Sequence, residues 1–394
     1  MSLHGVLAAS ARREVALLRT RPWDLAMMSW VPLLAVALIW WIFSAGLPTH
    51  LPIGVLDQDH SALSRQVVRF LDATPGLRVV QRYDDEGAMA RALTSGAVDA
   101  VVLLPRNLSR DVKQGRAGQA VLLHNAQLGT HSSLIQRDVR TAIGTVSAGI
   151  ELSVRNKRGE SMTAARASME PIRANMVTLF NTSSDYERFL GAALIPAVLH
   201  ILAMTAGAWA VGRELRDGTI AEWLGSGPRW HEALAALAGK LALPFASLSL
   251  VALLAMLWIT AGRGWHPAGS LGWALFALLV FLALSITLGG FASAITRSLR
   301  TALSATGFIT APAFAFGGVG FPLVAMPMLA RAWAYLLPYT HYIRVQMEQL
   351  QMGAPLVYSL ATPLWMIIAT AVLLGLSASA LASAAREPRS WGKR

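Results

Sequence analysis

The group best suited to acid-base or metal chemistry in the sequence is formed by Asp57, Asp59 and His60. These residues precede Ser61, where a helical pattern begins, and aspartate is a common capping residue at such a position. We therefore expect a capping role there. The chain has no cysteine, which excludes a disulfide framework, a thiolate metal site and a cysteine nucleophile. We predict no catalytic residue, metal ligand or cofactor-binding residue in this chain.

Two ionisable residues, His200 and Lys240, stand inside long apolar runs. Burying a lysine in a bilayer costs roughly 2.5–3.5 kcal/mol on insertion scales, so such groups are candidates for function. Lys240 lies near one end of its run, and we expect its amine to reach the headgroups in a mainly structural role. His200 either lines a substrate path or hydrogen-bonds a neighbouring helix.

The composition points to a membrane protein, since 54% of the 394 residues are hydrophobic and only 14% are charged. Leu25 to Phe43 is an uncharged run long enough to cross a bilayer. A cleaved signal peptide is the alternative for it, but the length of the run and the basic leader before it favour an uncleaved anchor. Five more runs of spanning length follow, at Phe189 to Val211, Leu234 to Thr260, Leu271 to Ile295, Ala302 to Val319 and Pro363 to Ala384. The sequence therefore predicts an α-helical integral membrane protein with six transmembrane helices.

The basic residues indicate the orientation, because short cytoplasmic segments are enriched in Lys and Arg. With six spans, the main clusters before span one, between spans two and three, between four and five, and after six all fall on one side. Both termini are therefore expected in the cytoplasm. The net charge of +12 is then a topology signal, and nucleic acid is not expected as a partner.

The segment from Leu47 to Asp185 reads as a water-facing domain, because it lacks a spanning run and holds 13 of the 22 acidic and 16 of the 34 basic residues. Strand and helix patterns alternate through LPIGVLDQD, SALSRQVVRFLDAT, LRVVQRY, DDEGAMARALTSG and VDAVVLLP, and AVLLHNAQ offers a further strand. A helical pattern then runs from Leu134 to about Arg166. We expect an inserted extracytoplasmic α/β domain.

The expected organisation runs in five parts along the chain. It comprises a cytoplasmic interfacial amphipathic helix at 1–22, the first span at 23–46, the α/β domain at 47–185, spans two to six at 186–385 and a basic cytoplasmic tail at 386–394. Within the fourth part we expect a short cytoplasmic helix at 213–225 and an external segment at 321–358.

The short cytoplasmic helix is predicted from a turn followed by an apolar face. Asp217 or Thr219 can cap it, and Gly218 permits a tight entry. Ile220, Trp223 and Leu224 form the apolar face. A helix lying in the headgroups explains this pattern as well as a docking helix does.

The segment 321–358 is too polar and too rich in proline for a simple span, and reads as short helices at the outer surface, with Tyr339 and Tyr342 suited to the membrane interface. The candidate outer-gate residues are Phe321, Pro322, Met326, Pro327, Pro338, Tyr339 and Tyr342. The alternative is an interfacial loop that fixes the neighbouring spans. Glycines before the segment, Gly317 and Gly318, permit close helix packing.

Three stretches carry a resemblance to a known family. GRELRDGTIAEWLGSG at 212–227, FPLVAMPMLARAWAYLLPYTHYIRVQMEQLQMG at 321–353 and LPIGVLDQDHSALSRQVVRFL at 51–71 resemble, in order and placement, the ABC-2 permeases of ATP-binding-cassette exporters that have a large external domain between their first two spans. The resemblance covers nearly the whole chain. It implies a coupling role toward an ATPase for Arg213, Glu214, Asp217, Gly218, Thr219, Ile220, Trp223 and Leu224, and a translocation path past His200, Gly317 and Gly318.

The resemblance also implies the partners. The chain has no G-x-x-x-x-G-K-[ST] sequence, so ATP and magnesium would be bound by a separate ABC ATPase subunit. The implied assembly is a homodimer or a pair with a similar permease in the lipid of a bacterial inner membrane, with a periplasmic adaptor and outer-membrane channel as an extension. The expected cargo is an amphiphilic drug, a lipid or a related compound. Sodium extrusion is the alternative within the family, and a receptor or anchor whose outer domain binds a ligand is the alternative outside it.

Overall fold

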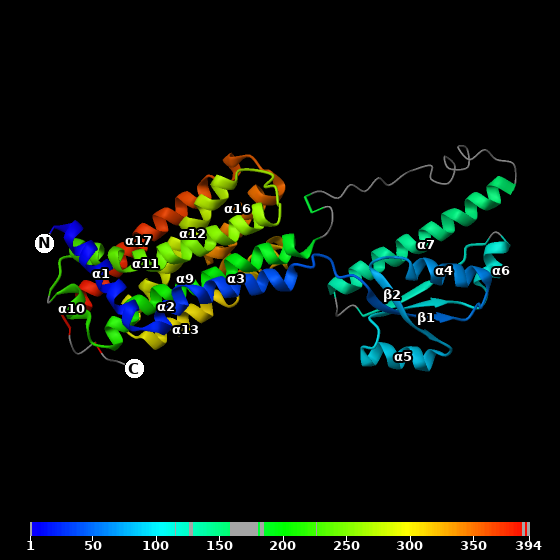
Figure 1. The fold of residues 1–394 in the computed structure, drawn as a ribbon, viewed down its shortest axis with the longest axis horizontal. Helices are drawn as coiled ribbons and strands as arrows, with labels where there is room; N and C mark the ends of the chain where they lie inside the picture. The colour runs from blue at the N-terminus through cyan, green and yellow to red at the C-terminus, as the bar shows by residue number, and fades with distance from the viewer. Residues whose placement is uncertain are drawn as a thin grey trace. The chain divides into compact units, whose positions relative to one another are not determined.

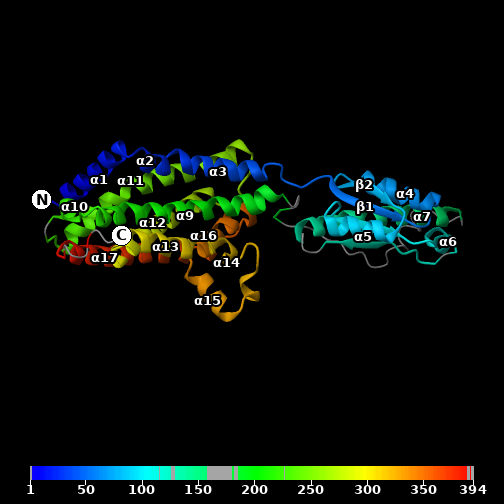
Figure 2. The same cartoon turned by 90° about the horizontal axis from the view of Figure 1, so that it is seen from below.

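The computed structural model describes residues 2–114, 116–125, 129–157, 180–181, 185–225, 227–387 and 391. The chain divides into two compact units. A helical unit comprises Met1–Gly46 and Thr178–Arg394, and an α/β unit comprises Leu47–Val177 (Figures 1 and 2).

Four helices in the described residues are long and apolar enough to cross a membrane. They are α9 (Ala192–Arg216), preceded by a π-helical turn at Glu187–Gly191, α11 (Trp230–Leu257), followed by a π-helical turn at Trp258–Gly262, α12 (Leu271–Thr296), and α17 (Ala361–Ala385), which follows a 3-10 turn at Leu356–Tyr358. A fifth span exists if α2 (Pro22–Met28) and α3 (Trp30–Phe43), bent by 41°, cross together. The first predicted span is thus interrupted at Ser29.

The predicted fifth span, Ala302 to Val319, is not a single helix. It divides into α13 (Leu299–Thr310) and α14 (Ala313–Phe316). Pro312 stands between them, and proline removes a helical hydrogen bond and clashes with the preceding turn. Neither piece is long enough to span a membrane. The described residues therefore contain four or five candidate spans, fewer than the six predicted.

The remaining helices of this unit are shorter. They are α1 (Leu3–Thr20), α10 (Ile220–Leu224), a 3-10 turn at Leu323–Ala325, α15 (Met328–Leu336), α16 (Pro338–Met347) and a π-helical turn at Glu348–Met352. Figure 1 shows α1, α10 and the last turns of α17 gathered at one end of the bundle, while α16 lies at the other end. The long helix α9 connects the two ends.

Glycines allow α9 and α12 to cross at backbone contact. A Cβ atom on Gly207 would lie 1.9 Å from the carbonyl oxygen of Ile286, and one on Gly289 would lie 1.9 Å from that of Met204. Ser293 strengthens the crossing by donating a 2.7 Å hydrogen bond to the carbonyl of Ala208. Small residues at helix crossings are typical of membrane bundles, where packing replaces the hydrophobic effect.

The α/β unit is built on one four-stranded sheet in the order β2-β1-β3-β4. Its elements are β1 (Leu51–Asp57), α4 (Ala62–Asp72), β2 (Leu77–Tyr83), α5 (Glu86–Ser95), β3 (Ala100–Leu104), α6 (Leu108–Lys113), β4 (Val121–His124) and α7 (Gly129–Lys157). β1 pairs in parallel with β2 and β3, whereas β4 is antiparallel to β3. Helix α5 covers one face and α4 with α7 the other (Figure 1). The helical pattern expected beyond Lys157 lies outside the described residues.

Candidate coupling site

A cluster of buried charges joins four helices at the end of the bundle that holds α1 and α10. Lys240 of α11 places its Nζ atom 3.0 Å from Glu14 Oε2 of α1 and 2.7 Å from Glu214 Oε1 of α9. Arg213 of α9 pairs with Glu14 and, at 2.8 Å, with Asp24 of α2. Glu14 and Lys240 are fully buried, and Arg213 and Glu214 are 1% exposed. We call Glu14, Asp24, Arg213, Glu214 and Lys240 the buried charge cluster.

Each charge in this cluster faces at least one charge of opposite sign. An isolated buried ion carries a desolvation cost of several kcal/mol, and only close pairing with further hydrogen bonds offsets it. Glu214 meets that condition, because it also accepts hydrogen bonds from Arg13 at 3.3 and 3.2 Å and one from the hydroxyl of Thr219. The cluster therefore depends on the helices keeping their relative positions, since separating any of them leaves buried charges unpaired.

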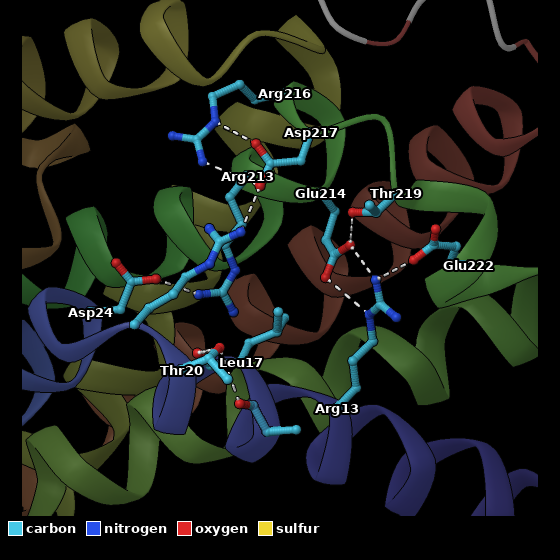
Figure 3. A network of polar contacts seen from close by, with 12 residues as sticks. Arg13, Leu17, Thr20, Asp24, Arg213, Glu214, Arg216, Asp217, Thr219 and Glu222 are labelled. Carbon is cyan, nitrogen blue, oxygen red and sulfur yellow. Dashed lines mark hydrogen bonds and ion pairs between the residues drawn. The ribbon is translucent and has the colours of Figure 1, made fainter.

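More exposed ion pairs, which we call the outer ring, lie next to the buried charge cluster. Figure 3 shows Arg13, Arg216, Asp217 and Glu222 beside the cluster residues Asp24, Arg213 and Glu214. Arg13 reaches Glu222 of α10 at 3.2 Å. Asp217, at the end of α9, binds Arg216 at 2.7 Å and Arg21, which precedes α2, at 3.0 Å. The hydrogen bond from Arg216, with the further contact from Arg21, holds the pKa of Asp217 below its usual value. The ring ties the loop after α9 to the N-terminal helices.

The short helix of this loop differs from its predicted form. Arg213 and Glu214 belong to the last turns of α9, so the separate helix is Ile220–Leu224 rather than 213–225. Thr219 occupies the N-cap position without a side-chain capping bond, since its hydroxyl donates to Glu214 instead. Gly218 has a φ of +70°, which explains why glycine suits the tight entry.

The apolar face of α10 points into the bundle. Ile220 is fully buried, and Trp223 lies under the Lys240 ammonium, 4.7 Å from its ring centre. The indole of Trp223 donates a 2.8 Å hydrogen bond to Ser10 of α1, which itself donates to the carbonyl of Ala236. Ile220 and Trp223 therefore hold α10 onto its own chain and are not exposed to a partner. Leu224 is partly buried against the same core.

The predicted path residues do not meet the charge cluster. His200 is buried in the middle of α9 and makes a 2.8 Å hydrogen bond through Nδ1 with Ser285 of α12, the helix-contact alternative of its two predicted roles. Gly317 lies beside the Tyr339 ring, where a Cβ atom would come within 2.4 Å of a ring carbon. Gly318, with a φ of +83°, lies in the turn after α14.

The candidate gate residues lie at the opposite end of the bundle, in two different environments. Phe321 is exposed and Pro322 precedes the 3-10 turn, while Pro327 and Pro338 stand at the starts of α15 and α16. Met326 is buried.

Tyr339 and Tyr342 were expected at a membrane interface, and the structure corrects this, because both are fully buried. Tyr339 donates a 2.8 Å hydrogen bond to the carbonyl of Ala193 at the start of α9. Tyr342 stacks on Phe281 with ring centres 4.8 Å apart and donates to Gln346 at 2.8 Å. Helix α9 therefore contacts the gate segment at its first turn and the charge cluster at its last turns.

The expectation for Lys240 also needs correction. Lys240 is fully buried, and its amine forms ion pairs with Glu14 and Glu214. It therefore does not extend to the headgroups. Sequence reasoning missed Glu14 and Asp24 altogether. A signal for Glu14 was present, because an acidic residue stands with Ser10 and Leu18 on the face by which α1 packs on α11.

Asp57 and Asp59, near the start of the α/β unit, form hydrogen bonds within that unit. Asp57 Oδ1 accepts hydrogen bonds from the backbone N–H groups of Asp59 and His60, both at 3.0 Å, and Oδ2 accepts one from Ser64 at 2.7 Å. Asp59 accepts from the backbone N–H of Ser109. These contacts fit a turn that enters α4. Across the described residues, no group of three or more His, Cys, Asp or Glu residues is placed to hold a metal ion.

Comparison with known proteins gives the family. The model of a family described as ABC-2 family transporter protein matches residues 22–380. A search of curated proteins found no match. The match includes α9, α11, α12 and most of α17, together with the α/β unit, α10 and the gate segment, and it leaves out the whole of α1. The chain belongs to the ABC-2 family of transporter proteins and is a multi-pass membrane permease.

Proposed function

We propose that this permease couples ATP hydrolysis on a separate ABC ATPase subunit to transport through the buried charge cluster. Membership of the family implies such a partner, and the chain has no phosphate-binding loop of its own. The observation that carries the proposal is the position of Glu214, which binds Lys240 of α11, Arg13 of α1 and Thr219 at the start of α10. A displacement of α10 or α1 would therefore be transmitted directly to α9 through the contacts of Glu214.

The ATPase would contact the exposed side of this end of the bundle. Ile220 and Trp223 are used internally, so Glu222, which is 67% exposed, and the turn residues Gly218 and Gly225 offer the accessible surface. Movement there would be transmitted along α9 to the hydrogen bonds that Tyr339 and Gln346 make at its other end. The role of 321–358 as an outer gate is part of the same proposal.

The finer features complete the proposal. We propose outward transport of amphiphilic compounds by a homodimer, or by a pair with a similar permease, in a bacterial inner membrane with both termini in the cytoplasm and the α/β unit outside. A periplasmic adaptor and an outer-membrane channel would extend the path. Ion extrusion is less well supported, because the buried carboxylates described in the four long helical segments, Glu187 and Glu214, lie at their ends and not along the middle.

Neutralising Glu214 is expected to uncouple the complex. In Glu214→Gln the shape is kept, but the carboxylate no longer accepts charge-assisted hydrogen bonds from Arg13 and Lys240, each worth roughly 1.5–3 kcal/mol. We expect ATP-driven extrusion of ethidium from proteoliposomes containing permease and ATPase to fall about tenfold relative to ATP hydrolysis. Glu86→Gln, an exposed change in the α/β unit, is the control. An assembled Glu214→Gln complex with unchanged extrusion per ATP would contradict the coupling proposal.

The orientation can be tested with single cysteines, because the chain has none. Arg110 on α6 and His231 on α11 are both exposed in their own units. In intact cells, a membrane-impermeant maleimide is expected to label Arg110→Cys at once, and His231→Cys only after the membrane is permeabilised. Labelling of both from the same side would rule out the proposed topology.

A further inference from the structure

A cavity of about 250 Å³ lies at the bend between α2 and α3, next to the charge cluster. Its walls come from α1, α2 and α11, through Val15, Leu18, Leu25, Met28 and Leu243. Ser29 and Ser247 also line it, but their hydroxyls are already hydrogen-bonded to the carbonyls of Leu25 and Met28. The interior therefore offers apolar surface and no free hydroxyl.

One charged group, Arg19, stands on the lining of this cavity. It is exposed and takes part in none of the ion pairs among the described residues, in contrast to Arg13 and Arg21 on either side of it. An unpaired arginine beside an apolar cavity matches a ligand with an anionic head and an apolar tail.

The size of the cavity restricts that ligand. Pockets that enclose a whole small molecule measure roughly 300–1,000 Å³, so this one is too small for a complete amphiphile. It has room for part of one acyl chain, with the head remaining outside near Arg19. Leu25 and Val15 at the edge are exposed, which leaves an entrance from the side.

The surroundings point to the membrane as the source. Trp23 and Trp30, on either side of the bend, are 78% and 54% exposed. Tryptophan is typical of the level of lipid headgroups, and basic pockets between helices on the cytoplasmic side bind anionic lipid heads. We propose that this cavity binds an anionic phospholipid of the surrounding leaflet, one acyl chain inserted against Leu18 and Leu243 and the phosphate on Arg19.

Such a lipid would stabilise the contact between α1 and α11, which the buried charge cluster also holds together. The cavity and the Glu14–Lys240 ion pair both lie between α1 and α11, so an inserted chain would fill the space beside that pair. The inference uses the membrane location that the family establishes and rests on the proposed cytoplasmic placement of the termini, but it does not depend on coupling to an ATPase. Its test therefore uses the permease alone, so that its failure and that of the coupling proposal are distinguishable.

The test is native mass spectrometry of the purified full chain in detergent, titrated with phosphatidylglycerol or with phosphatidylcholine of the same acyl chains. We expect the chain to retain phosphatidylglycerol preferentially. Arg19→Gln should reduce that preference about fivefold, as loss of one basic contact at a lipid surface does. Leu243→Trp, which fills the cavity, should reduce retention of both lipids.

Matched controls separate the site from general effects. Arg12→Gln removes another exposed arginine of α1, and Leu250→Trp adds an indole to an exposed position of α11; neither residue lines the cavity. Both are expected to behave as the unmodified chain. Equal retention of the two lipids would overturn the proposal, as would matching behaviour of Arg19→Gln and Arg12→Gln. If soluble glycerol phosphate displaced the lipid, the site would recognise only the phosphate. That result would overturn the proposed insertion of an acyl chain.

Discussion

Lys240→Met is expected to destabilise the helical unit by about 3–5 kcal/mol, the usual cost of removing one partner from a buried ion pair. The change leaves Glu14 and Glu214 buried with one arginine each, Arg213 and Arg13. Counted together with Arg13, the cluster is then left with one excess negative charge, because the three carboxylates of Glu14, Asp24 and Glu214 face only two arginines. Methionine fills similar space, so the loss reports the charge and not the packing.

Thermal unfolding of the full chain in detergent measures this effect. Lys113→Met, an exposed change on α6, serves as the control and should leave the melting temperature unchanged. Lys240→Met combined with Glu14→Gln restores the balance of charge and should recover part of the lost stability, giving a clear coupling energy in a double-mutant cycle. If Lys240→Met melts like the Lys113→Met control, or if the two changes are simply additive, the cluster does not hold these helices together.

The sequence predicted the long helices well, because their signal is local. An uninterrupted apolar run must be a helix in a bilayer, so α9, α11, α12 and α17 follow from composition and length. The breaks were harder to predict. Pro196 and Pro244 lie inside intact helices, whereas the chain breaks at Pro312 and at Ser29. Whether neighbouring helices satisfy the backbone around a proline depends on tertiary packing, which one sequence does not specify.

The strands and helices of the α/β unit also appear where alternation predicted them, from Leu51–Asp57 to Ala100–Leu104. Their pairing was not predictable from the pattern alone. β1 lies between β2 and β3, which puts the first strand in the interior of the sheet. The buried pattern of β1, with Ile53, Val55 and Leu56 fully buried, reflects that interior place.

The coupling site was only half predictable. The loop at 213–225 carried a visible turn and an apolar face, but the pattern did not reveal that Trp223 would bind Ser10 from more than two hundred positions away. Likewise, Lys240 was read as a lysine that reaches water, because its partner Glu14 lies on a helix that looked interfacial. Ion pairs between distant segments have no periodic signal. They become visible only when the fold brings the helices together.

Gly289→Ala is expected to destabilise the helical unit by about 1–3 kcal/mol or more, because it overpacks the crossing of α9 and α12. The new Cβ would lie 1.9 Å from the carbonyl oxygen of Met204 and 2.8 Å from the backbone nitrogen of Ala208. Both atoms belong to a helix backbone, so neither moves aside as a flexible side chain would. The two helices must separate, and the hydrogen bond from Ser293 to Ala208 must lengthen.

The adjacent glycine provides the control for this prediction. A Cβ on Gly290 would meet its nearest neighbour, a methyl group of Val211, at 3.5 Å, which is ordinary contact. Gly290→Ala should therefore keep or raise the melting temperature in detergent, since alanine favours the helix by roughly 1 kcal/mol over glycine. Helix propensity is the same at both positions, so a difference between the two variants isolates the crossing. Equal melting temperatures would mean that α9 and α12 do not touch there, and a change at the charge cluster would then have no rigid α9 along which to reach the gate.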